Sequence, residues 1–324
     1  MKVHTIFYAA LIASTAIGQA MAADFTLNVN TALTTDDPLY KGLETFRDEI
    51  AKRSEGKIEI KLFPNSQLGS DEDVIEQARA GAPVAVVVEG GRLANYVKEF
   101  GIMTAPYIAK SYEGVRKVTV SPLFAEWEKK LHDTAGLQVL SFNWSQGERQ
   151  VIMNKPVKTP ADLAGVRMRT PGAPVWIETV RAMGATPAPM PYSEVYSAMQ
   201  QQVIDAVEAQ IPAAYGSKLQ EVAKHITKTH HIFLITGLVA SGGWYDSLPD
   251  NLKTIVREEA LKAGDVASYG TRDSIAGLEK KMEEAGVTFH EIDVEPFRKA
   301  TEVVYDKLGY GELREQIQAI AEGN

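Results

Sequence analysis

Segments with the residue pattern of strands alternate with segments that have the pattern of helices along most of this 324-residue chain. Residues 25–30 and 57–62 alternate apolar and polar side chains, as a half-buried strand does. Between them, apolar residues recur at helical spacing from Leu39 to Arg53. Because such helices are too long for hairpin connections, the pattern predicts an α/β fold with largely parallel sheets.

One long helix and several shorter elements complete this pattern. Apolar residues recur at helical spacing over residues 248–284, which suits a helix with one buried face that Gly264 and Gly270 interrupt. Ser70 followed by Asp73 is typical of a capped helix start. Further strands are expected at residues 83–88, 137–142, 149–154 and 165–170, and further helices at residues 74–80, 122–132, 174–183, 192–202 and 296–321. The long helix can lie across two lobes, which a chain of this length has the apolar surface to form.

The first 22 residues have the features of a secretory signal peptide. Lys2 precedes an apolar run at residues 6–17, and Ala20 and Ala22 supply the small residues of a cleavage site. The run is about a dozen residues long, whereas roughly 20 are needed to span a bilayer, and no later segment is apolar for so long. We therefore expect export to the periplasm, a mature chain that begins at Ala23, and no insertion into the membrane.

Composition and motifs exclude several functions. The formal net charge is −8 at pH 7, and an acidic surface argues against nucleic acid or anionic lipid as a partner. The absence of cysteine rules out disulfides, thiolate metal sites and cysteine nucleophiles. No HExxH, GxSxG or phosphate-loop pattern occurs, and His230 and His231 would face opposite sides of a strand. We therefore expect no catalytic residue, no metal and no cofactor.

Arg169 is the first candidate for a ligand anchor. It shares one strand face with Arg167, and it lies at the carboxyl end of the expected strand 165–170. Ligands of open α/β sheets gather at the carboxyl ends of strands, and a guanidinium fits a carboxylate through two parallel hydrogen bonds. In the alternative interpretation Arg169 pairs with an internal Asp or Glu. Arg167 is expected to be solvated.

A second strand end carries Glu89, Gly90, Gly91 and Arg92 in succession. Two charges and two positions without side chains stand where a ligand can approach the backbone closely. The alternative interpretation is a glycine turn with a surface ion pair. Aromatic residues near the ends of expected elements can cover a sugar or carbon skeleton, and they are Trp144, Trp176, Tyr192, Trp244 and Tyr245.

Several motifs resemble those of the solute-binding proteins of tripartite ATP-independent periplasmic (TRAP) transporters, the DctP family. They are Arg149-Gln150, the segments 160–171 (PADLAGVRMRTP), 184–187 (GATP) and 190–200 (MPYSEVYSAMQ), and the shorter matches at residues 56–60, 63–69, 100, 105–107 and 248–249. The resemblance extends over essentially the whole mature chain.

The resemblance implies a two-lobed periplasmic binding protein fold with a hinge and a long helix that spans both lobes. The first lobe would comprise residues 23–146 and 235–274, and the second lobe residues 147–234 and 275–324. Such a protein closes around a small carboxylate ligand and presents it to the membrane permease subunits of the transporter. We expect a monomer that is not an enzyme.

The resemblance also implies roles for individual residues. Arg169 matches the arginine that clamps the carboxylate, and Arg149 matches a second arginine of the acidic-sugar binders. The remaining candidates fall on positions that line the pocket of the sialic-acid-binding branch or adjoin it, and they are Asp71, Glu89, Arg92, Tyr192 and Gly172. In the implied mechanism the two arginines come from one lobe, and Asp71, Glu89 and Arg92 from the other complete the cage.

The expected ligand differs from sialic acid. Ala32, Gly172 and Ala209 stand where the sialic-acid branch has asparagines, so hydrogen bonds to a large sugar would be missing, at about 1 to 3 kcal/mol for each buried group left unpaired. The retained Glu89 and Arg92 favour a polyhydroxylated acid, and we expect a hexuronate or a related sugar acid. The alternatives are a C4-dicarboxylate, an aromatic acid or sialic acid, and, for the protein as a whole, a ligand sensor or a periplasmic sugar-acid enzyme.

Overall fold

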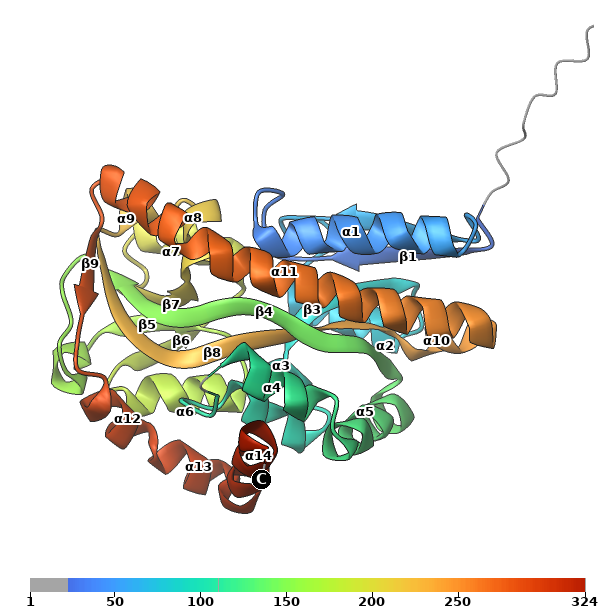
Figure 1. Ribbon diagram of the computed structural model, residues 1–324. Helices are drawn as coiled ribbons and strands as arrows, with labels where there is room; N and C mark the ends of the chain where they lie inside the picture. Colours follow the sequence, from blue (N-terminus) through green and yellow to red (C-terminus); the bar gives the residue numbers. More distant parts are fainter. Residues whose placement is uncertain (1–22, 110, 324) are drawn as a thin grey trace, which may run out of the picture.

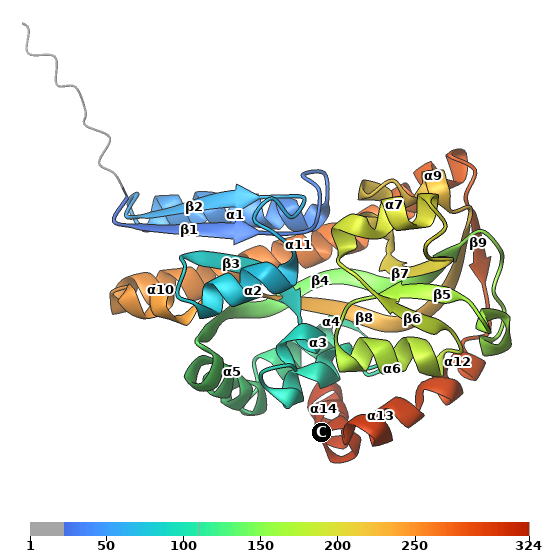
Figure 2. The same ribbon diagram turned by 180° about the vertical axis from the view of Figure 1, so that it is seen from behind.

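The computed structural model describes residues 23–109 and 111–323. The expected signal peptide at residues 1–22 lies outside the described residues. Within them, helices cover both faces of one mixed β-sheet (Figures 1 and 2). No helix in this part of the chain is both long and apolar enough to cross a membrane.

The sheet has the strand order β2-β1-β3-β8-β4-β7-β5-β6, and β9 pairs with β8. The strands are β1 (Phe25–Asn30), β2 (Ile58–Phe63), β3 (Val84–Glu89), β4 (Leu137–Met153), β5 (Arg167–Thr170), β6 (Thr186–Pro189), β7 (Ala206–Gln210), β8 (His225–Ser241) and β9 (Thr288–Glu291). Pairing is parallel in the outer parts of the sheet, where β1 contacts β2 and β3, and β5 contacts β6 and β7. In the centre, β3–β8, β8–β4 and β4–β7 are antiparallel. β9 also pairs parallel with β8, so the expectation of largely parallel sheets is confirmed for most strand pairs and fails only for these three central pairs.

The central strands β4 and β8 are each 17 residues long and extend from one end of the molecule to the other (Figure 1). The sequence predicted two strands at 137–142 and 149–154, and this was wrong because residues 143–148 lack an apolar alternation but continue the pairing. Register shifts between β4 and β8 absorb the irregularity, and Gly147 has a φ of +89° at one of them. Seen from behind, β1, β2 and α2 lie at one end of these strands and β5, β6 and α6 at the other (Figure 2).

The structure has helices in all the predicted regions and further helices, such as α4 and α10, that the sequence analysis did not predict. The helices are α1 (Pro38–Arg53), α2 (Asp71–Arg79), α3 (Gly90–Leu93), α4 (Tyr112–Thr119), α5 (Pro122–Ala135), α6 (Pro174–Ala182), α7 (Val195–Gln200), α8 (Ile211–Gly216), α9 (Leu219–Val222), α10 (Gly242–Ser247), α11 (Asp250–Glu284), α12 (Glu295–Thr301), α13 (Val303–Leu308) and α14 (Gly311–Glu322), with 3-10 turns at Lys98–Thr104, Pro160–Leu163 and Tyr192–Glu194. The single helix expected at 296–321 is three helices, and Gly309, with a φ of +63°, ends the second. The capped start of α2 is confirmed, because Ser70 Oγ accepts from the Asp73 N–H and Asp73 Oδ2 accepts from the Ser70 N–H.

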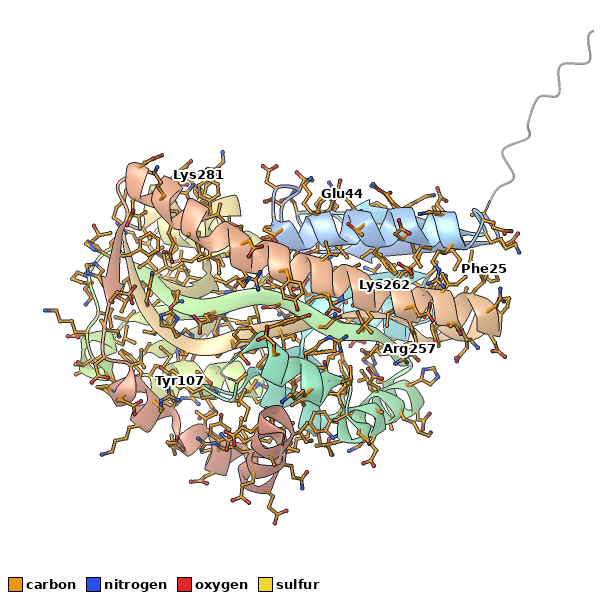
Figure 3. The ribbon with its side chains drawn as sticks, viewed as in Figure 1. Phe25, Glu44, Tyr107, Arg257, Lys262 and Lys281 are labelled. Carbon is orange, nitrogen blue, oxygen red and sulfur yellow. The ribbon has the colours of Figure 1, made fainter. Side chains whose placement is uncertain are left out.

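Helix α11 spans the molecule lengthwise over β4 (Figure 1). Near one end Arg257 pairs with Glu128 of α5 at 3.2 Å, and near the other the Lys281 ammonium lies 5.7 Å from the ring centre of Tyr215 in α8 (Figure 3). Contrary to the prediction, neither Gly264 nor Gly270 interrupts the helix. The reason at Gly264 is packing on the sheet. A Cβ there would overlap the Asn143 side chain of β4, so the glycine permits close packing on the sheet.

Four clusters of buried apolar side chains pack on the sheet, two at each of its ends. Two flank β1, β3 and the adjoining parts of β4 and β8, with Phe100 and Phe46 among their fully buried members. Two smaller clusters flank β5 and β7, and include Met199 and Met168. Ile317 of α14 belongs to the same cluster as Phe100, so the end of the chain packs on the first predicted lobe. The lobe boundaries stay a prediction.

Candidate functional site

A cavity lies between the carboxyl ends of β3, β5 and β7 and the loop that follows β1. The space between its lining atoms, open solvent included, is about 480 Å³. Its lining consists of Thr31, Ala32, Leu33, Asp71, Val87, Glu89, Arg92, Gln146, Arg149, Arg169, Pro171, Trp176, Tyr192, Gln210 and Leu234. Six of the seven predicted site residues are in this set. Gly172 is not; it is exposed, and a Cβ added there would have no heavy atom within 4 Å other than those of its chain neighbours.

Arg169 is a buried cation without a carboxylate partner in the described part of the chain. Only 1 % of the residue is exposed, and its Nε and Nη2 donate to the Met190 carbonyl at 3.0 and 2.8 Å. Its guanidinium carbon lies 5.3 Å from the ring centre of Tyr192. Burial lowers the pKa of Arg169 to about 10, so it stays charged at neutral pH. The alternative interpretation, an internal ion pair, is wrong.

Arg149 is neutralised by Glu208, which the sequence analysis missed. Its Nη2 donates to Glu208 Oε1 at 2.8 Å and its Nε to Oε2, while its Nη1 donates to Gln210 Oε1 at 2.8 Å. Burial opposes ionisation of Glu208, but Arg149 and His231 together outweigh it and lower the pKa of that carboxyl. Buried His231 lies behind the pair, with its Nε2 3.6 Å from Glu208. Arg149 therefore adds donors to the cavity with little net charge.

At the side of the cavity opposite Arg169, three carboxylates surround Arg92. Its Nη1 donates to both Glu89 oxygens at 2.7 Å and its Nε to Glu72 at 2.6 Å, and its Nη2 lies 3.7 Å from Asp71. This side therefore carries more negative than positive charge. The ion pair of Glu89 and Arg92 is buried, so the alternative of a surface pair is wrong.

The two glycines of this turn make room for the protein itself. A Cβ at Gly90 would overlap the Phe100 carbonyl, and a Cβ at Gly91 would lie 2.5 Å from Nε1 of Trp176. The expectation that a ligand approaches the backbone here is therefore replaced by close packing of the chain on itself.

Asp71 presents an acceptor to the cavity. Its Oδ1 is buried and has no hydrogen-bond partner among the described residues. Burial raises the pKa of Asp71 to about 6, although Arg92 acts in the opposite direction. A buried acceptor left unpaired is costly, and a hydroxyl of a bound ligand would pair it.

We expect the Asp71→Asn variant to be more stable than the wild type at pH 7 in the absence of ligand. A carboxyl whose folded pKa is raised stabilises the fold below its unfolded pKa, near 4, and this contribution is lost as the pH rises through 6. The loss at pH 7 is about 3 kcal/mol, which the amide avoids. Denaturant unfolding at pH 4 and pH 7 measures it. Asp205→Asn is the control of opposite sign, because Arg167 lowers the pKa of Asp205 to about 2. Equal stability of Asp71→Asn and wild type at both pH values would contradict the prediction.

Comparison with known proteins gives one family and many relatives. Residues 29–311 match the family described as bacterial extracellular solute-binding protein, family 7. The C4-dicarboxylate-binding periplasmic protein DctP of Rhodobacter capsulatus is 30% identical over 320 residues, which are 96% of this chain and 94% of that protein. The sialic acid-binding periplasmic protein SiaP of Vibrio cholerae is 27% identical over 83% of this chain and 84% of its own length.

Solved structures of TRAP periplasmic solute-binding proteins have the same fold. One from Ochrobacterium anthropi with bound L-fuconate is 34% identical, covers 92% of this chain and 100% of that one, and has a TM-score of 0.89. One from Escherichia fergusonii in an apo open state is 47% identical, covers 91% and 99%, and has a TM-score of only 0.79. The chain therefore superposes better on the ligand-bound structure than on the more identical open one.

Proposed function

Because the chain belongs to the family 7 bacterial extracellular solute-binding proteins and matches TRAP solute-binding proteins over more than nine-tenths of its length, we propose that its ligand is a monocarboxylic sugar acid such as a hexonate or hexuronate. The carboxylate docks on Arg169, and the hydroxyls face Asp71 and Glu89. The bound acid is then delivered to the permease subunits of a TRAP transporter.

The distribution of charge in the cavity carries this proposal. Arg169 has no carboxylate partner among the described residues, so it can take one ligand carboxylate through two charge-assisted hydrogen bonds. At the other side Asp71 and Glu89 offer acceptors, which suit hydroxyl donors. A second ligand carboxylate would meet the excess of negative charge around Arg92. The cavity therefore favours a polyhydroxylated monocarboxylate over a C4-dicarboxylate.

Relatives support this ligand class. TRAP solute-binding proteins of known structure hold L-fuconate, L-galactonate and β-D-galacturonate, each a carboxylic acid with several hydroxyls. They are 34%, 27% and 27% identical to this chain. The C4-dicarboxylate-binding relative keeps the main alternative open to experiment.

The ligand-binding side chains come from two separate sets of elements, and this arrangement supports closure of the protein around the ligand. Arg169 and Arg149 come from β5 and the far part of β4, whereas Asp71, Glu89 and Arg92 come from α2, β3 and α3. A ligand that contacts both sets has a higher affinity for the closed state, and this difference is what shifts the population. We propose that the protein acts in the periplasm as a monomer and releases the acid unchanged. Mass spectrometry of acid recovered after incubation would detect turnover and so contradict the last point.

A thermal-shift screen followed by titration calorimetry tests the ligand class. We expect hexonates and hexuronates to raise the melting temperature, because a ligand that binds only the folded state stabilises it in proportion to the logarithm of its concentration over Kd. At a concentration about 100-fold above Kd the gain is about 3 kcal/mol. The neutral parent sugars and succinate serve as controls and should give no shift. Stabilisation by succinate alone would contradict the proposed class.

A further inference from the structure

Trp176 joins the two sides of the cavity. It stands in the first turn of α6, only 1 % of it is exposed, and its ring lines the cavity. The indole Nε1 donates to Glu89 Oε1 at 3.2 Å, so a side chain of the second predicted lobe holds a carboxylate of the first. That carboxylate is the one that also binds Arg92.

The same indole lies against the charged group on the other side. The guanidinium carbon of Arg149 is 4.7 Å from the centre of the Trp176 ring, within the range of cation–π attraction. Trp176 thus fixes the spacing between Arg149, which is held by Glu208, and Glu89, which is held by Arg92.

The chain is shaped to admit this ring. A Cβ at position 91 would lie 2.5 Å from Nε1 and 2.8 Å from Cδ1 of Trp176, so Gly91 leaves the space that the indole fills. No positive φ requires a glycine there, since Gly91 is absent from the residues with left-handed backbone. The ring therefore occupies volume beside Glu89, at the side of the cavity opposite Arg169.

We propose that Trp176 is a specificity-determining residue that limits the length of the acid the cavity accepts. The inference rests on the proposed function, in which the ligand carboxylate binds Arg169 and the carbon chain extends toward Glu89. The indole closes the space beyond that chain, so acids of the length held by the relatives, L-fuconate and L-galactonate, fit and longer acids are excluded. As one of the largest buried side chains it also covers the carbon skeleton with an apolar face.

Calorimetric titration of the wild type and of Trp176→Ala with sugar acids of four, six, seven and nine carbons tests the proposal. We expect the wild type to bind the six-carbon acid best. Trp176→Ala should bind that acid at least about 10-fold more weakly and shift its preference toward the seven- or nine-carbon acid. An unchanged order of affinities in the variant would overturn the proposal.

Trp176→Phe gives a second readout that a purely structural role would not produce. The variant keeps a ring but loses the N–H on Glu89, so it should bind the six-carbon acid more weakly and lose the ligand-induced change in tryptophan fluorescence. Trp127→Phe is the matched control, because Trp127 lies in the apolar core away from the cavity, and it should keep both. A full fluorescence response in Trp176→Phe would count against the proposal.

Failure of the proposed function and failure of the length limit set by Trp176 would give different results. Binding of dicarboxylates alone by the wild type would contradict the proposed function, and the length limit would then be measured with dicarboxylates of four to nine carbons. Loss of the limit in Trp176→Ala would still support the role of the indole, and its persistence would overturn it.

Discussion

Replacement of Arg169 by Ala is expected to weaken binding of the sugar acid by at least about 30-fold. The guanidinium is the cation of the cavity that lacks a carboxylate partner in the described chain, and its loss would leave the ligand carboxylate buried and unpaired. Truncating one member of such a pair typically costs about 2 to 5 kcal/mol of binding free energy, and each 1.4 kcal/mol is about tenfold in Kd. Titration calorimetry with the acid found in the screen measures the effect.

The same experiment separates binding from folding. Arg169→Met should unfold at the same denaturant concentration as the wild type or at a higher one in the absence of ligand, because it removes a buried charge without a carboxylate partner. Arg167→Ala is the control on the same strand face. Its side chain is 48% exposed and pairs with Asp205 rather than with the cavity, so its affinity should stay unchanged. Binding by Arg169→Ala within about threefold of the wild type would disprove the clamp.

The features that the sequence predicted well are those set by local chemistry. The capping of α2 by Ser70 depends on residues three apart, and the position of Arg169 depends on the end of one strand. The long helix α11 follows from the spacing of its own apolar residues. In each case the signal lies within a few residues of the feature, so no knowledge of distant contacts was needed.

The features that the sequence did not predict depend on contacts between distant segments. Glu208 neutralises Arg149 across the pairing of β4 with β7, 59 residues away in the chain. A charged residue in a strand of otherwise uncharged residues was the available signal, but this signal does not identify its partner. The continuity of β4 through Gly147 and the contact of Trp176 with Gly91 likewise follow from how distant elements pack. Sequence patterns together with the family resemblance therefore located the cavity residues, whereas the structure was needed to distinguish which arginine has no carboxylate partner in the described chain.

That distinction gives the second large expected effect, which concerns stability. Glu208→Ala is expected to lower the free energy of unfolding by about 3 to 5 kcal/mol, because it leaves Arg149 buried without its carboxylate. The unpaired charge of Arg149 would also repel Arg169, since the charge of Arg149 already helps to lower the pKa of Arg169. Denaturant unfolding of the ligand-free protein at pH 7 measures the change. Glu291→Ala is the matched control, since that carboxylate pairs with Lys228 on the surface and is 74% exposed, so its loss should cost at most about 1 kcal/mol.

The double variant Arg149→Met/Glu208→Leu tells whether the pair serves stability or binding. Replacing both charges by apolar side chains removes the two desolvation penalties together, and such replacements are often neutral or stabilising. We expect the double variant to recover most of the stability that Glu208→Ala loses, yet to bind the sugar acid more weakly, since the donors of Arg149 at the cavity are gone. Recovery of stability with wild-type affinity would show that Arg149 serves the fold alone. Failure to recover stability would show that the favourable interactions of the ion pair exceed the desolvation penalties of its two charges.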